Sequence, residues 1–331
     1  MSTALILGIG GQDGTLLAEL LTSKGYTIVG VARDTARARQ RLPEAKFRNV
    51  VLEERDATNE HDLIALIDRY RPDEVYNLAA RSSGIGMFDQ PAEIAIANGV
   101  AVVRLLHAVH RAGTPIRVCQ ASSSEMFGEP LASPQTEATP FNPRSPYGAA
   151  KVYAHTMVDI HRRTHGAHAS SLILFNHESA LRPPHFVTRK VALGAACVAL
   201  GLIPELSLGN LDARRDWGFA GDYVRAMWLA LQQSTPRDYV VATGQTHSVR
   251  DLCAVAFEHV GLDYRRYVVS GAASYRADEK GQLVGNAERA RTLLGWQPTV
   301  GFEAMIRAMV DADLERLRAG SASPEDLRDR R

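Results

Sequence analysis

Four residues that can move protons stand in two short segments of the chain. Residues 120–128 (QASSSEMFG) place Ser123 two positions before Glu125, where a run of apolar residues ends. Residues 145–155 (SPYGAAKVYAH) place Tyr147 four positions before Lys151, so both lie on one face of a helix. An ammonium beside a phenol favours the phenolate, which lets the tyrosine exchange protons near neutral pH. We predict that Tyr147 and Lys151 take part in proton transfer, and Ser123 and Glu125 are candidates for the same site. The alternatives are a solvated loop carboxylate for Glu125 and a buried aromatic at a helix start for Tyr147.

A glycine-rich turn precedes the first expected helix. Gly8, Gly11 and Gly14 have the spacing G-x-x-G-x-x-G between an apolar run and a helical pattern. Glycine allows the tight turn and lets the backbone approach a pyrophosphate at the helix N-terminus. The alternative is a plain strand–helix turn, because short glycine patterns also occur by chance. We predict a dinucleotide-binding loop that includes Gln12 and Asp13.

The residues after the second expected strand bear on the type of cofactor. An acid there accepts hydrogen bonds from ribose hydroxyls, whereas an arginine pairs with a 2′-phosphate. The chain has Arg33 followed by Asp34, with Arg37 and Arg39 close behind. The three arginines favour NADP, and Asp34 keeps NAD as the alternative. We also expect cofactor contacts from Asp56, after the third strand, and from four residues after the fourth: Leu78, Ala79, Ala80 and Ser82.

The elements that position these residues alternate between strand and helix patterns. Short apolar runs lie at 3–8, 27–33, 47–54, 74–80, 117–123 and 170–175, with helical spacing between them. This alternation predicts an α/β fold, a doubly wound parallel sheet with helices on both faces. We expect a domain of residues 1–175 with returns from about 211–250, a smaller lobe over 176–318, helices near 187–200 and 248–261, and a flexible tail over 319–331.

Composition narrows the class of protein. With 331 residues and a formal net charge of +1, the chain has no reason to bind nucleic acid or an acidic membrane. The three cysteines are far apart and lack metal-site spacing, so we expect reduced thiols and no metal. The first residues lack the pattern of a signal peptide, and the most apolar later stretch is broken by Gly201 and Pro204. We expect a cytoplasmic protein.

The glycine spacing, Ser123, Tyr147 and Lys151 together resemble the extended short-chain dehydrogenase/reductase family, which acts on nucleotide sugars. The chain is most similar to the GDP-mannose 4,6-dehydratases of that family. Matching blocks run from residue 7 to about 298, among them LGIGGQDGTLLAELLTSKGY, EVYNLAA, QASSSEMFG, SPYGAAK, LILFNHESALR and LGNLDARRDWGFAGDYVRAMWL. The resemblance implies a Rossmann domain that binds NADP, a C-terminal nucleotide-sugar-binding lobe and a hydro-lyase activity. A 4-epimerase, a 4-keto-reductase and a non-catalytic paralogue are the alternatives.

The resemblance also implies a mechanism. Tyr147 takes the proton of the sugar's 4-hydroxyl while hydride passes from C4 to NADP. Glu125 removes the proton at C5, and the 6-hydroxyl leaves as water with acid from Glu125 or Ser123. Hydride then returns to C6, which gives the 4-keto-6-deoxy sugar from GDP-mannose or a close analogue such as a GDP-heptose. Lys151 is expected to lower the pKa of Tyr147.

Other residues carry over from the family by position. Tyr147 and Lys151 hold the nicotinamide ribose, and His177 and Arg182 match further cofactor contacts. The residues that match the grip on the GDP-sugar are Asn176, Lys190, Arg215, Arg276 and Glu279. The resemblance implies a homo-oligomer, either a dimer or a tetramer. The chain departs from the family at Arg81 and Met87, where the family has glutamine and serine.

Overall fold

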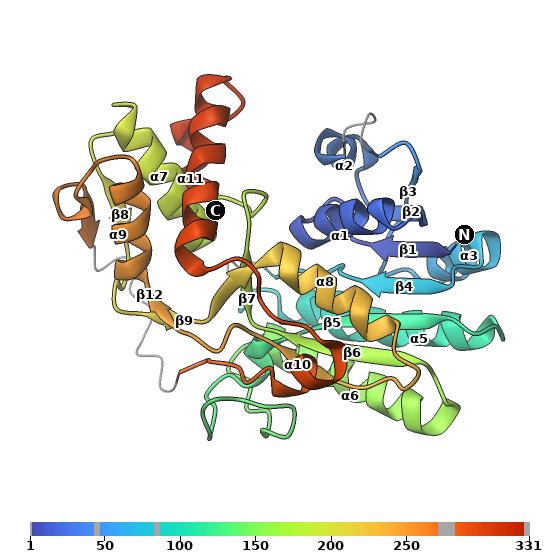
Figure 1. The fold of residues 1–331 in the computed structure, drawn as a ribbon. Coiled ribbons are helices and arrows are strands. Elements are labelled where there is room, and N and C mark those ends of the chain that lie inside the picture. The colour runs from blue at the N-terminus through green and yellow to red at the C-terminus, as the bar shows by residue number, and fades with distance from the viewer. Residues whose placement is uncertain (1, 43–46, 83–86, 271–281, 328–331) are drawn as a thin grey trace.

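A parallel sheet of seven strands forms the centre of the molecule (Figure 1). The computed structural model describes residues 2–42, 47–82, 87–270 and 282–327. In spatial order the strands are β11 (Tyr239–Val241), β6 (Ala169–Leu174), β5 (Arg117–Ser123), β4 (Glu74–Asn77), β1 (Thr3–Leu7), β2 (Thr27–Ala32) and β3 (Val50–Glu54). All neighbouring pairs are parallel. The predicted doubly wound parallel sheet is confirmed.

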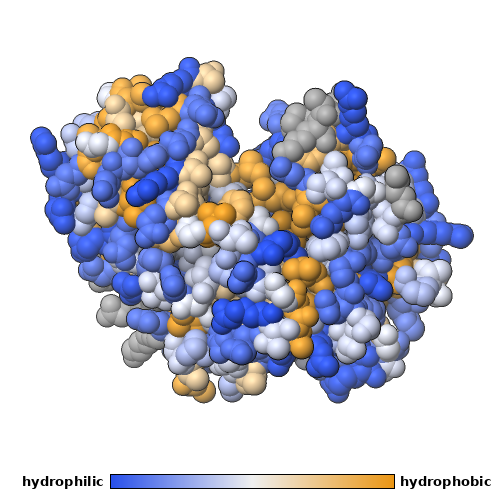
Figure 2. Space-filling view, viewed as in Figure 1, coloured by the Kyte–Doolittle hydropathy of each residue, from blue (hydrophilic) through white to orange (hydrophobic). Residues whose placement is uncertain are grey.

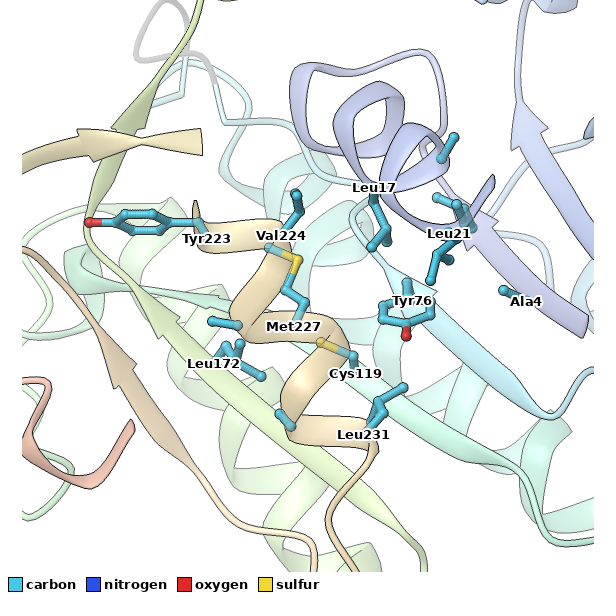
Figure 3. Close-up of a cluster of buried hydrophobic side chains, with 14 of the residues drawn as sticks. Ala4, Leu17, Leu21, Tyr76, Cys119, Leu172, Tyr223, Val224, Met227 and Leu231 are labelled. Carbon is cyan, nitrogen blue, oxygen red and sulfur yellow. The ribbon is translucent and has the colours of Figure 1, made fainter. Parts of the chain in front are cut away.

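Helices cover both faces of this sheet, which is why its strands are apolar on both sides. One face is covered by α1 (Gln12–Ser23), α8 (Ala220–Leu231) and α10 (Glu288–Leu294), and the other by α3 (Glu60–Tyr70), α5 (Ala101–Arg111) and α6 (Pro146–His165). Figure 3 shows the first face, where Leu17 of α1 and Met227 of α8 point toward Tyr76 and Leu172 of the sheet. Each fully buried side chain of this size contributes about 1.5–3 kcal/mol to folding.

A smaller lobe follows β6. Its helices α7 (Val187–Ala199), α9 (Val249–His259) and α11 (Phe302–Arg318) share one apolar core with β8 (Leu206–Leu208). The short strands β13 (Val268–Ser270), β9 (Arg214–Arg215) and β12 (His247–Ser248) complete it, and a 3₁₀ turn over Pro324–Leu327 contacts α7. The pair β7 (Asn176–Glu178) and β10 (Trp217–Phe219) connects this lobe to the large sheet. The domain boundaries expected from the sequence, including the flexible tail, stay a prediction.

The two parts leave a hollow between them. In Figure 2 the surface is hollowed between the part that carries α7 and α11 and the part that carries α2 (Thr35–Arg41). The carboxyl ends of parallel strands lie along one edge of such a sheet, and ligands bind there. The residues after β1, β2, β4 and β5 therefore lie along a single edge.

One helical stretch has the length and composition of a membrane span. It covers Pro91–Arg111, formed by α4 (Pro91–Ala95), a π-helical turn (Ile96–Val100) and α5. Half of its apolar window is buried inside the molecule, and core helices of soluble proteins have the same composition. The stretch therefore gives only weak support for a membrane span.

Candidate active site

Ser123 and Glu125 stand at the corner where β5 ends. The Ser123 hydroxyl accepts a hydrogen bond of 3.2 Å from the backbone N–H of Glu125, which caps a 3₁₀ turn over Ser124–Met126. The first turn of α6 lies directly beneath, because a Cβ on Gly148 would be 2.5 Å from the Glu125 carbonyl oxygen. The corner is therefore held by its own cap and by the close approach of α6, and the Glu125 side chain is half-buried.

Tyr147 and Lys151 lie on the first two turns of α6. Ser145 caps this helix by accepting a 3.0 Å hydrogen bond from Gly148 N–H, and Pro146 is its first residue. Tyr147 is 9% exposed and its phenol is hydrogen-bonded to Ser123. The Lys151 ammonium donates a 2.8 Å hydrogen bond to the Ala121 carbonyl and lies 5.6 Å from the centre of the Tyr147 ring. The structure thus brings the four predicted catalytic residues together.

The pKa of Tyr147 differs from the expectation. Burial raises the pKa of Tyr147 to about 12, and the charges of Glu125 and Asp13 add to this effect. The Ser123 hydrogen bond and the charge of Arg182 oppose it without overcoming it. Burial also lowers the pKa of Lys151 to about 8, and its ammonium points to a backbone carbonyl. The predicted lowering of the tyrosine pKa is therefore wrong here, because desolvation outweighs the Ser123 hydrogen bond and the charge of Arg182.

The glycine turn between β1 and α1 is closed against the end of β4. Gly8 has a positive φ of +85°, and a Cβ there would lie 3.0 Å from the backbone nitrogen of Ala79, next to Leu78. A Cβ on Gly14 would lie 2.4 Å from the Gly8 carbonyl oxygen. Gly11 caps α1 without a side chain, so the first N–H groups of the helix can face a ligand. Side chains at these glycines would fill the space around the turn. Because that space is open, the turn fits a dinucleotide pyrophosphate.

Gln12 and Asp13 connect the glycine turn to β7. Gln12 Nε2 donates to the His177 carbonyl at 3.0 Å, and Ser179 Oγ donates to Gln12 Oε1 at 2.9 Å. His177 Nε2 lies 2.9 Å from Asp13 Oδ2. Burial is the largest single effect on both groups, but the partner's charge and the hydrogen bonds together outweigh it, so the pKa of His177 is raised and that of Asp13 is lowered. The contact links the first helix to the start of the second lobe.

The remaining predicted cofactor residues follow the ends of β2, β3 and β4. Arg33 is exposed directly after β2, and Asp56 is exposed after β3, where its carboxylate accepts a 2.9 Å hydrogen bond from Thr58 N–H. Ala80 and Ser82 are exposed after β4. These positions lie along the sheet edge that starts at the glycine turn.

The predicted substrate residues are spread over the second lobe. Asn176 begins β7, and Arg215 lies in β9. Lys190 of α7 lines a cavity of about 300 Å³ together with Glu205 and Glu325. Arg182, predicted for the cofactor, pairs with the buried Glu178 at 3.0 Å. Arg276 and Glu279 lie outside the described residues.

Comparison with known proteins decides the family. The family model described as GDP-mannose 4,6 dehydratase matches residues 5–309. The chain belongs to the GDP-mannose 4,6-dehydratase family. It is 45% identical to GDP-mannose 4,6 dehydratase 2 of Arabidopsis thaliana, over 94% of this chain and 87% of that protein. It is 42% identical to the GDP-mannose 4,6-dehydratase of Sinorhizobium fredii, over 95% of this chain and 97% of that protein.

The predicted family and the predicted enzyme class are therefore confirmed, since a dehydratase is a hydro-lyase. Solved structures agree on the fold of this GDP-mannose 4,6-dehydratase family member. UDP-glucose 4-epimerase of Thermotoga maritima with UDP-glucose superposes with a TM-score of 0.84 at 23% identity, over 95% of this chain and 99% of that one. RMD of Pseudomonas aeruginosa complexed with NADPH superposes with a TM-score of 0.80 at 22% sequence identity, over 96% of this chain and 100% of that one. The fold is thus one that accommodates epimerases as well, and it does not by itself distinguish the reactions.

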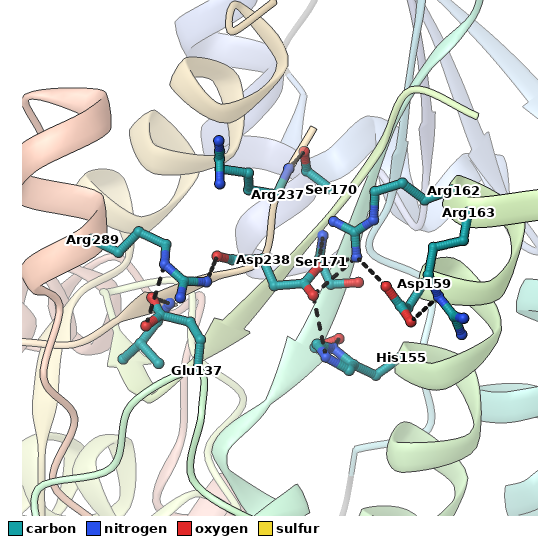
Figure 4. Close-up of polar contacts among 12 residues, drawn as sticks. Glu137, His155, Asp159, Arg162, Arg163, Ser170, Ser171, Arg237, Asp238 and Arg289 are labelled. Atoms are coloured by element: carbon teal, nitrogen blue, oxygen red, sulfur yellow. Dashed lines mark hydrogen bonds and ion pairs between the residues drawn. The ribbon is translucent and has the colours of Figure 1, made fainter. Parts of the chain in front are cut away.

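The sequence reasoning missed His155, a buried residue of α6. Its Nδ1 lies 3.2 Å from Ser122 Oγ, and its Nε2 lies 3.7 Å from Asp238 Oδ2 (Figure 4). Arg162 of the same helix donates to Asp238 at 2.8 Å. The network fixes α6 to β5 next to Ser123. His155 follows Lys151 by four residues, and that helical spacing is the signal that could have found it. Among the described residues, no group of three or more His, Cys, Asp or Glu side chains could hold a metal.

Proposed function

We propose that the protein converts GDP-mannose, or a close GDP-sugar such as a GDP-heptose, to the 4-keto-6-deoxy sugar with NADP as cofactor. The observation that carries the proposal is the hydrogen bond between Ser123 and Tyr147, with Glu125 two residues further along the same corner. A hydroxyl, a phenol and a carboxylate then face one site. Membership of the family supports this reaction.

The residues divide the proton transfers between them. Tyr147 accepts the proton of the sugar's 4-hydroxyl, and Ser123 holds the oxygen through its hydroxyl. The ammonium of Lys151, next to the Tyr147 ring, stabilises the phenolate that results. A nicotinamide held beside Tyr147 and Lys151 would supply the redox chemistry, a hydride taken from C4 and returned to C6.

Glu125 acts on the neighbouring carbon. A 4-ketone acidifies the proton at C5, and the carboxylate removes it. The same carboxyl group then supplies the proton with which the 6-hydroxyl leaves as water. C5 regains a proton when the hydride returns to C6, and the proton that Tyr147 took from the 4-hydroxyl balances it. A 4-epimerase or a 4-keto-reductase needs no base at C5. The role of Glu125 therefore separates dehydration from those two reactions.

The test is Glu125→Gln, which keeps the shape of the side chain and the capped backbone. Loss of a general acid–base group lowers turnover by about 10²- to 10⁴-fold. Mass spectrometry would follow the loss of one water from GDP-mannose and, in parallel, from a GDP-heptose. Glu129→Gln, four residues along and exposed, is the matched control and retains turnover. Full turnover in Glu125→Gln contradicts its role, and no product from the unmodified protein with either sugar contradicts the function.

NADP is favoured over NAD by the residues after β2. Arg33 is exposed there, whereas the Asp34 carboxylate already accepts a 2.8 Å hydrogen bond from Arg37 N–H. The same cofactor would be held by the glycine turn, by Tyr147 and Lys151, and by His177 with Asp13. Equilibrium titration with NADPH and NADH tests the preference. Equal affinities would contradict it.

We also propose a homo-oligomer in the cytoplasm. The helical stretch Pro91–Arg111 is apolar, yet only half of its most apolar part is buried. Ile96, within it, is 44% exposed, and Tyr153 of α6 is 47% exposed. An apolar helix face of this kind suits a second copy of the chain. Light scattering of Ile96→Lys and Tyr153→Lys should show a lower mass than the unmodified protein. The three buried free cysteines suit a reducing compartment.

A further inference from the structure

The acidic residue that follows β2 is engaged in holding a helix. Asp34 is the N-cap of α2, and its side chain accepts a hydrogen bond from the backbone N–H of Arg37. A cap of this type contributes about 1 kcal/mol to a helix. One of its carboxylate oxygens is thereby committed to the backbone. The residue that accepts ribose hydroxyls in NAD-binding proteins has a structural role here.

Arg41, at the other end of α2, reaches the glycine turn. Its Nη1 donates a 3.0 Å hydrogen bond to the Gly10 carbonyl. Helix α2 is docked at that point, because a Cβ on Gly10 would lie 3.2 Å from the Cβ of Ala38. The same turn is joined to the end of β2, since Gly8 N–H donates to the Val31 carbonyl at 3.0 Å. The guanidinium therefore lies where the glycine turn, the end of β2 and α2 meet.

The charges around Arg41 are positive. Its side chain is partly buried, and burial together with Arg37, Arg189 and Arg316 lowers its pKa. Arg189 lies on α7 and Arg316 on α11, across the hollow seen in Figure 2. Those two share one carboxylate, that of Asp313, so one positive charge remains there. Within the described ranges, the only acceptor that Arg41 contacts is the Gly10 carbonyl.

This arrangement suits a phosphate. A guanidinium has five N–H donors in a planar fork, and it binds phosphate oxygens through two parallel hydrogen bonds. In the dinucleotide-binding fold the adenosine ribose lies at the end of the second strand, beside the glycine turn. A phosphate on its 2′-oxygen would therefore come close to Arg41 and relieve the repulsion among the arginines.

We propose that Arg41 binds the 2′-phosphate of NADP and is the residue that chiefly sets the preference for NADP over NAD. The proposal rests on the cofactor assigned under the proposed function, and it places the selectivity on α2 rather than on Asp34. Arg33 and Arg37 add to the positive charge near the phosphate.

The test is Arg41→Met, titrated at equilibrium with NADPH and with NADH and followed by nucleotide fluorescence. A charge-assisted hydrogen bond contributes about 1.5–3 kcal/mol, so the Kd for NADPH should rise about 10- to 150-fold. The Kd for NADH should change less than about twofold, because NADH has no 2′-phosphate. Arg48→Met, an exposed arginine just before β3 at the opposite edge of the sheet, is the control and should leave both values unchanged. Asp34→Asn, which retains a capping side chain, should also leave the NADH affinity unchanged.

Two results would overturn the proposal. An equal loss for both nucleotides in Arg41→Met would mean that the arginine only braces the glycine turn or contacts the pyrophosphate. No loss for either would mean that it does not reach the cofactor. Arg41→Lys, which keeps the charge without the fork, should retain part of the preference. Dehydration of GDP-mannose by the unmodified protein is measured separately, so a failure here leaves the proposed reaction standing.

Discussion

Lys151, which we propose takes part in catalysis, should destabilise the folded protein. It is 3% exposed and donates one hydrogen bond, to the Ala121 carbonyl. Burial lowers its pKa from 10.5 to about 8. At 1.36 kcal/mol per pH unit, that difference corresponds to a cost of about 3 kcal/mol for keeping the charge inside the protein. Lys151→Met removes this cost with a side chain of similar length.

Lys151→Met removes a cost of about 3 kcal/mol but also loses a hydrogen bond worth about 1 kcal/mol. The expected gain in stability is therefore about 2 kcal/mol near neutral pH. The Ala121 carbonyl still accepts a 2.9 Å hydrogen bond from Gln120 Nε2, so it does not become unpaired. Turnover should fall sharply in the same variant, since the phenolate of Tyr147 loses its neighbouring positive charge. A variant that is more stable and less active is the predicted combination.

The pH dependence gives the sharper measurement. Below about pH 8 Lys151 is charged in both the folded and the unfolded chain, so the full cost of burying its charge acts against folding. Between about 8 and 10.5 the unfolded chain binds the extra proton, and the stability of the unmodified protein therefore rises with pH. Urea unfolding at about pH 7 and about pH 9.5 should show the advantage of Lys151→Met shrinking by about 2 kcal/mol. Tyr147 titrates in both proteins, and its raised pKa of about 12 places its effect at higher pH.

A lysine at the surface provides the control. Lys24→Met removes an exposed charge whose ammonium lies 3.6 Å from the centre of the Trp228 ring, and it should not reproduce the gain in stability of Lys151→Met. If Lys151→Met were less stable than the unmodified protein near neutral pH, or if its advantage did not change with pH, the reasoning from burial would be refuted.

Three further substitutions test other parts of the structure. Asp313→Asn breaks the buried pair with Arg189, and urea unfolding should show a loss of about 3–5 kcal/mol. Gly14→Ala places a Cβ 2.4 Å from the Gly8 carbonyl oxygen, so unfolding should show a loss of about 1–3 kcal/mol and titration a weaker affinity for the dinucleotide. His155→Ala should lower kcat about tenfold with little change in KM, as expected for a positioning residue, and His155→Gln should restore part of kcat. Unchanged values would contradict each of these expectations.

The sequence predicted the features that depend on local pattern. Alternating apolar runs and helical spacing were enough for the parallel sheet, because strands covered on both faces must be apolar throughout. The four residues predicted to be catalytic lie together because Ser123 ends a central strand and Tyr147 begins the next helix, at one edge of the sheet. Both inferences need only the order of elements and the rule that ligands bind at strand carboxyl ends.

Features that depend on tertiary burial could not be predicted. The direction of the Tyr147 pKa shift is set by desolvation, and Asp13, which is 134 positions away in the sequence, makes only the smallest contribution to it. The role of Asp34 depends on where α2 begins, since the same carboxylate would be free if the helix started one residue later. Ser122 and His155 are 33 residues apart and meet only because α6 packs on β5.

The links between the two lobes explain how one site can act on neighbouring sugar carbons. Gln12 and Asp13 belong to the helix that follows the glycine turn, whereas His177 and Ser179 begin the second lobe. Two hydrogen bonds and the contact between Asp13 and His177 join them, and the His177 ring stacks on Tyr223 at 4.6 Å. A reaction that takes hydride from one carbon and returns it to another needs cofactor and sugar held in one relative position. Since these contacts join the glycine turn to the start of the second lobe, disrupting the Asp13–His177 pair should misplace the sugar relative to the dinucleotide even where each still binds.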